Sequence, residues 1–205
     1  SLPPGMCQLE IEQRQFHNRV ERDVMPVCNI WFDAEIGIGH QRVAVRDAPR
    51  ADSIVYQLKK VFATADASEW AFGIGAATVR AVNTSEKSGT RQHYINALLS
   101  RQFGAMALHA NLGGVVDREA EPGTRRNRLT WALAAEYETT LRWTLVGEVL
   151  GQRGQPATAQ VGLRWWALPK YVQFTTSLGA QRGSGRDGRW MSFGIRFETG
   201  DPVIW

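Results

Sequence analysis

The chain has 205 residues, of which 43% are apolar, and a formal net charge of +4. With a mean hydropathy of −0.29, it has no run near the roughly 18 to 20 apolar residues that a membrane-spanning helix needs. Its basic residues are scattered or lie in predicted loops, without an aromatic-studded basic stripe, so we expect no nucleic-acid partner. The length suits a single domain over 1–205. No spacing predicts a metal site, and we expect no cofactor.

Alternation of apolar and polar residues predicts twelve β-strands, because successive side chains of a strand point to opposite faces. The first two are the least regular: residues 8–12 alternate well, and 19–27 would be a short returning strand. Without 19–27 the count is ten, which stays the alternative. Clearer strands are predicted at about 30–45, 52–63, 70–83, 90–103, 105–118, 126–139, 142–153, 158–168, 170–182 and 188–199.

The connections between these strands alternate in length. Tight turns are predicted at 65–68, 104, 140–141 and 168–170, and longer polar loops at 83–90, 117–126, 151–157 and 181–188. Short turns at one rim and longer loops at the other are typical of outer-membrane barrels, in which the short turns are periplasmic. The predicted fold is therefore an all-β, transmembrane, antiparallel up-and-down barrel, with residues 201–205 as a tail at the periplasmic rim.

Alternation by itself also fits a soluble barrel with a solvated polar outside. Two features favour a membrane-spanning barrel over a soluble one. The polar face carries charges of both signs, as an enclosed interior needs for pairing. On the apolar face, aromatic residues gather close to the tight turns, as expected of a girdle at the membrane interface. That girdle is predicted to contain Trp70, Tyr137, Trp143, Trp165 and Tyr171.

The last predicted strand and the cysteines fit the same compartment. Met191, Phe193, Ile195 and Phe197 alternate with polar residues and glycine, which resembles the C-terminal targeting signal of outer-membrane barrels. We therefore expect the protein to lie in the outer membrane of a Gram-negative bacterium. Outer-membrane lipid or lipopolysaccharide would surround the barrel, and an envelope protein is a further candidate partner. Cys7 is predicted at the start of the first strand and Cys28 in the turn after the second. Both would lie at the periplasmic rim, where an oxidising environment favours a disulfide over two thiols.

The polar face supplies the candidate site. The charged residues of this face have two interpretations. In the first they form an interior network of ion pairs that holds the barrel shut, and in the second they form a constriction that selects solutes in a narrow pore. Twelve strands leave room for a small lumen, which the large inward residues Trp31 and Trp166 would narrow. The wider polar face includes Glu10, Glu12, Asp33, Lys59, Arg128 and Gln173. The lumen and constriction candidates are Glu35, His109, Asn111, Glu136, Glu148, Arg164, Arg196 and Glu198.

Catalysis is not expected. Lipid hydrolases of the outer membrane need Ser, His and a third orienting residue at the lipid-facing surface. His109 and Asn111 share one strand face, but alternation points them inward, and Ser100 on the preceding strand would be their inward neighbour. We interpret this His as a structural residue.

Five segments resemble a family of small proteobacterial outer-membrane proteins associated with transport in the phenol meta-degradation pathway: 94–104, 108–113, 131–137, 143–149 and 161–166. The resemblance implies a barrel and gives no catalytic residues. The leading hypothesis is a passive channel or uptake protein for small molecules, including hydrophobic or aromatic ones. The alternatives are a structural barrel that docks in a larger envelope assembly and a lipid-modifying hydrolase.

Overall fold

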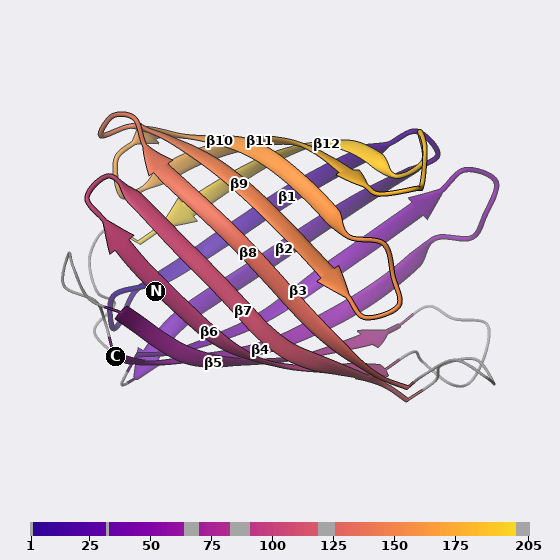
Figure 1. Ribbon diagram of the computed structural model, residues 1–205, viewed down its shortest axis with the longest axis horizontal. Coiled ribbons are helices and arrows are strands. Elements are labelled where there is room, and N and C mark those ends of the chain that lie inside the picture. Colours follow the sequence, from indigo (N-terminus) through magenta and orange to yellow (C-terminus); the bar gives the residue numbers. More distant parts are fainter. Residues whose placement is uncertain (1, 32, 64–69, 83–90, 119–125, 200–205) are drawn as a thin grey trace.

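The computed structural model describes residues 2–31, 33–63, 70–82, 91–118 and 126–199. Within these ranges no helix is long and apolar enough to cross a membrane. The chain forms one closed barrel of twelve strands (Figure 1). They are β1 (Cys7–Phe16), β2 (Arg19–Trp31), β3 (Ala34–Val45), β4 (Ala51–Ala63), β5 (Trp70–Ala81), β6 (Arg91–Phe103), β7 (Met106–Asp117), β8 (Asn127–Glu138), β9 (Trp143–Gln152), β10 (Thr158–Leu168), β11 (Val172–Gln181) and β12 (Arg189–Glu198).

Each strand pairs antiparallel with its sequence neighbours, and β1 pairs with β12 to close the barrel, with Gln8 opposite Glu198. Closure leaves no open edge, so the backbone can satisfy its hydrogen bonds in lipid. The predicted up-and-down barrel of twelve strands is confirmed, and the alternative of ten is wrong.

The region between the second and third strands differs from the prediction. β2 continues to Trp31, so Cys28 lies within that strand and not in the turn after it, opposite Cys7. Asp33, predicted on the polar face of a strand, lies in the turn with a φ of 56°, a left-handed conformation that Asp tolerates better than most residues. The predicted turn at 65–68, the loop at 83–90, most of the loop at 117–126 and the tail at 201–205 lie outside the described residues.

The outer face of the barrel is apolar. Residues with the same parity along each strand expose large hydrophobic side chains, among them Ile95 at 63%, Leu133 at 58% and Val161 at 64%. A continuous apolar exterior of this extent is the surface that a transmembrane barrel presents to lipid. The polar residues alternate with these positions and therefore face inward, which is the predicted orientation.

A short apolar core lies inside the barrel, at the rim where β1 begins. Leu2 and Met6 pack on Val27, with Met25 beside them. The backbone N–H of Leu2 donates to Glu35 Oε1 at 2.9 Å, and the side-chain amide of Asn29 donates to the Leu2 carbonyl at 2.7 Å. Residues 2–6 thus fold into the mouth of the barrel on the side of β2 and β3.

Candidate functional site

Three cavities succeed one another inside the barrel. Two of them, of about 390 and 360 Å³, lie toward the rim with the longer loops and share Glu148, Leu150, Thr158 and Gln181. A third, of about 210 Å³, shares Arg14 and Gln160 with the first of these and reaches Arg164 and Arg196. The hollow interior therefore extends from the long-loop rim past the middle of the strands.

Ion pairs line the deep end of this interior. Arg164 Nη1 lies 2.8 Å from Glu136 Oε1. Arg196 pairs with Glu10 and, at 3.7 Å, with Glu198. The side chains of Arg164, Glu136 and Arg196 are each between a quarter and a third exposed, so these pairs are partly accessible to water in the lumen. Across the barrel, Lys59 Nζ lies 3.3 Å from Glu35 Oε1, next to Leu2.

Glu148 stands apart from these pairs. It accepts a hydrogen bond of 2.5 Å from the side-chain amide of Gln160, its direct neighbour on β10. Among the residues that the structure describes, no Arg, Lys or His forms an ion pair with Glu148. Glu148 and Arg164, both among the lumen candidates, are therefore not partners, since Arg164 pairs with Glu136. Glu148 instead borders both cavities on the long-loop side.

His109 and Asn111 have separate surroundings. Ser100 Oγ and His109 Nδ1 lie 2.8 Å apart on neighbouring strands, and His109 Nε2 lies 4.0 Å from Glu136. The expected proximity of Ser100 and His109 is thus present, inside the barrel and away from lipid. Asn111 lines the cavity of about 360 Å³ together with Asn96 and Thr130.

A second band of charges lies nearer the long-loop rim. Glu12 and Arg128 were predicted on the polar face, but no member of this band was among the constriction candidates. Arg19 Nε lies 2.7 Å from Glu21 Oε1, Arg14 bridges Glu12 at 3.2 Å and Glu21 at 3.8 Å, and Arg128 lies 3.5 Å from Asp117. The first predicted strand ended at residue 12, whereas β1 continues to Phe16. Arg14 follows Glu10 and Glu12 at a spacing of two, and this signal could have placed it inside.

Four residues of the predicted girdle, Trp70, Tyr137, Trp143 and Trp165, lie on the outside close to the short turns, and Tyr171 lies in the turn before β11. Trp143 and Trp165 stack across β9 and β10 with ring centroids 5.7 Å apart, and Phe174 continues the row at 5.8 Å. Trp70, Tyr137 and Tyr171 are about half exposed. Amphipathic rings at one level of an apolar exterior suit the boundary between lipid tails and head groups.

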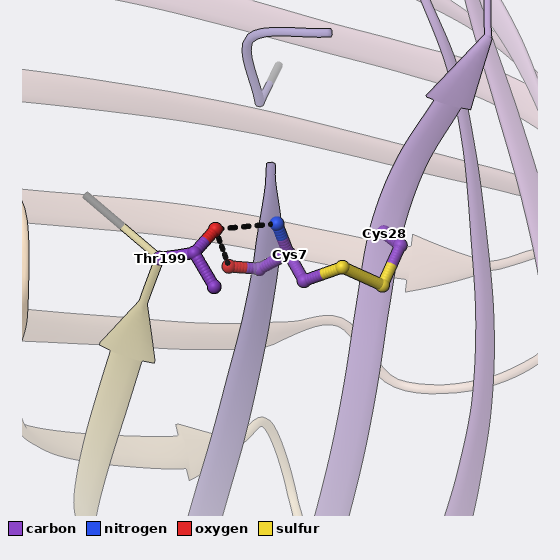
Figure 2. The surroundings of a disulfide bond; sticks show 3 residues. All are labelled: Cys7, Cys28 and Thr199. Carbon is purple, nitrogen blue, oxygen red and sulfur yellow. Dashed lines mark hydrogen bonds between the residues drawn. A yellow bond between two sulfur atoms is a disulfide. The ribbon is translucent and has the colours of Figure 1, made fainter. Parts of the chain in front are cut away.

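The predicted disulfide is present at the same rim. Cys7 and Cys28 face each other across β1 and β2 and are bonded (Figure 2). On the other side of Cys7, the hydroxyl of Thr199 makes two hydrogen bonds with the Cys7 backbone. Thr199 Oγ1 accepts from the Cys7 N–H at 2.9 Å and donates to the Cys7 carbonyl at 3.3 Å. The strand that carries the N-terminal segment is thus fixed to both neighbours where that segment enters the lumen.

The family model described as Uncharacterised conserved protein UCP029691 matches residues 2–198. The chain belongs to this family. No curated protein is similar enough in sequence to count as a relative.

Several solved structures share the fold of this UCP029691 member. The KdgM porin superimposes with a TM-score of 0.71 at 8% identity, covering 93% of this chain and 98% of that one. The NanC porin gives 0.66 at 11% identity, covering 94% and 98%. Outer membrane phospholipase A from Escherichia coli gives 0.56 at 11% identity, covering 97% and 91%. The chain thus has the barrel fold of these outer-membrane proteins, in agreement with the predicted localisation.

Proposed function

We propose that this protein is a passive outer-membrane channel for small polar solutes. The observation that carries the proposal is the succession of cavities inside the barrel, lined by charged and amide side chains. Carboxylates, amides and guanidinium groups can replace part of the hydration shell of a polar solute as it passes. The resemblance to the KdgM and NanC porins in fold supports the same class.

The inner face favours cations over anions. Its described acidic side chains outnumber its Arg and Lys side chains, although the whole chain is basic. The acidic set is Glu10, Glu12, Glu21, Asp23, Glu35, Asp117, Glu136, Glu138, Glu148 and Glu198. The basic set is Arg14, Arg19, Lys59, Arg128, Arg164 and Arg196. Glu148, bordering two cavities without a cationic partner in the described chain, is the carboxylate best placed to meet a solute cation.

Current through a planar lipid bilayer tests both parts of the proposal. The refolded protein should give steps of conductance, and a salt gradient should give a reversal potential of the sign for cation selectivity. Glu148→Gln should reduce that selectivity, whereas Asp47→Asn, which changes an exposed carboxylate in the loop between β3 and β4, should leave it unchanged. A protein that inserts but carries no current would refute the channel.

Transport of hydrophobic or aromatic molecules, suggested by the sequence resemblance to phenol-pathway proteins, is the competing substrate class. The charged lining supports it less well than polar solutes, because aromatic molecules gain little from carboxylates and guanidinium groups. Liposome uptake of phenol or catechol compared with that of small amines would decide between the two classes.

A structural role is the second candidate, favoured by one observation. Leu2 and Met6 are each only 7% exposed inside the barrel mouth, where they fill space that a channel would keep open. A sealed barrel that serves as a docking module would carry no current and would co-purify with an envelope protein after mild detergent extraction.

The Ser100–His109 pair gives the hydrolase hypothesis a concrete test. Glu136, which would orient the His, is held by Arg164 at 2.8 Å and lies farther, at 4.0 Å, from His109. We therefore expect no release of fatty acid from phospholipid by the refolded protein, with the His109→Ala variant as the matched blank.

A further inference from the structure

The lipid-facing wall of the barrel contains a groove of about 650 Å³ that the channel proposal does not use. Its lining is apolar and comes from β5 to β10, which run side by side in Figure 1. Trp70, Leu108, Leu133 and Val161 are among its outward-facing residues.

The strand register explains the hollow. Two adjacent rows of directly opposed residues cross β6 to β10 on the outer face. One row runs Arg101, Leu108, Ala135, Gly147 and Val161, and the next runs Leu99, Ala110, Leu133, Val149 and Ala159. Small residues interrupt both rows, between larger ones that form the banks of the groove.

Gly147 shows that the fold itself does not require this hollow. A Cβ atom added there would meet no atom within 4 Å, and the residue is not among those with positive φ. Neither backbone strain nor a close neighbour calls for glycine at this position. Its effect on the structure is to extend the hollow that begins at Ala135, its neighbour on β8, up to Val161, its neighbour on β10.

The dimensions of the groove suit a hydrocarbon chain. Strands lie about 4.8 Å apart, so the four spacings from β6 to β10 measure about 19 Å. One leaflet contributes about 15 Å of the hydrocarbon core. Because the strands of such barrels tilt by about 40° from the membrane normal, a row of this length descends about 12 Å through the membrane. A single acyl chain can therefore lie along the whole groove within one leaflet.

Arg101 stands at one end of the same row, directly between Trp70 and Leu108. Its guanidinium carbon lies 4.9 Å from the centre of the Trp70 ring and 4.6 Å from that of Phe103. Its Nε is buried and has no hydrogen-bond partner within the described chain, and no carboxylate there forms an ion pair with it. A guanidinium group on the lipid side, near the short turns, lies at the depth of the periplasmic head groups and can bind a phosphate through two parallel N–H bonds.

We propose that this groove binds one phospholipid of the periplasmic leaflet. The phosphate of this lipid accepts hydrogen bonds from Arg101, and its head group lies between Trp70 and Phe103. One acyl chain lies across Ala135 and Gly147 toward Val161. The apolar groove and the unpaired cation in one continuous row are the juxtaposition that carries the proposal. It stands independently of transport, because it concerns the opposite face of the wall.

Native mass spectrometry with added dipalmitoyl-phosphatidylglycerol tests the site. The wild-type barrel should retain one lipid through detergent stripping. Arg101→Gln removes charged hydrogen bonds and should weaken that binding about tenfold. Gly147→Leu, which fills the groove and leaves the cation in place, should weaken it to a similar extent.

Two control variants distinguish the site from general adhesion of lipid. Ala76→Leu places the same side chain at an exposed outer position on β5 outside the groove, and Arg189→Gln removes a cation at the long-loop rim. Both should bind like the wild type, with folding of all variants checked by their heat-dependent migration on gels. The proposal is overturned if Arg101→Gln and Gly147→Leu retain the lipid as well as these controls, or if lipid A binds the groove in preference to phosphatidylglycerol.

Discussion

Removing the Cys7–Cys28 disulfide should lower the free energy of unfolding of the barrel by about 3 kcal/mol. The two cysteines are separated by 21 residues in sequence. In the chain-entropy description, a cross-link closing a loop of that length removes about 11 cal/mol/K from the unfolded ensemble, which at 25 °C corresponds to about 3.3 kcal/mol. The strand pairing of β1 with β2 and β12 remains in the variant, so we expect a folded but less stable barrel.

The measurement is urea unfolding in detergent micelles, followed by tryptophan fluorescence, on the wild type and the Cys7→Ser/Cys28→Ser variant. The variant should unfold at lower urea, and wild type treated with a reductant should shift to the same midpoint. Reductant should leave the variant unchanged, which controls for effects on the detergent. Equal midpoints for oxidised wild type and the variant would show that the unfolded chain gains no freedom from loss of the bond, and the reasoning would fail.

Further predictions concern the ion pairs, the lipid face and the barrel mouth. Glu136→Gln leaves Arg164 without its carboxylate and should lower the unfolding free energy by about 1–2 kcal/mol, less than for a fully buried pair. The double variant Glu136→Gln/Arg164→Gln should recover part of this loss. A double variant no more stable than Glu136→Gln would argue against the pairing. Leu133→Arg on the lipid face should cost about 2–4 kcal/mol, whereas Leu141→Arg in an exposed turn should cost little, so equal losses at both positions would contradict the proposed orientation. Deleting residues 2–6 should raise single-channel conductance, and an unchanged conductance would mean that this segment does not narrow the passage.

Most of the fold could be predicted because the lipid imposes a period of two on every strand. From Trp143 to Val149 each outward residue is apolar or glycine, so the strand and its orientation follow from the sequence. The prediction failed where this signal breaks. Pro26 lies within β2, and neither it nor Met25 has a partner on β3. The predicted strand nevertheless ran through Pro26 to residue 27. It stopped short of Trp31 because the next strand was placed from about residue 30.

The interior was only partly predictable. Alternation assigns side chains to the inner face, but it does not give their depth along tilted strands. The residue opposite Glu148 on β10 is Gln160, four residues from Arg164. At about 3.3 Å per residue this is about 13 Å, too far for an ion pair. Residues 2–6 have no periodic pattern at all, so their position in the mouth could not be inferred from the sequence.

The disulfide has one consequence for the plug that Leu2 and Met6 form. The bonded Cys7 directly follows Met6 in the sequence. The five residues from Leu2 to Met6 can reach at most about 18 Å from it when fully extended. Even if the plug swings out of the mouth, the covalent tether keeps it within that radius of the rim. Opening would thus be a local and reversible movement, and the mouth would close again when Leu2 packs on Val27.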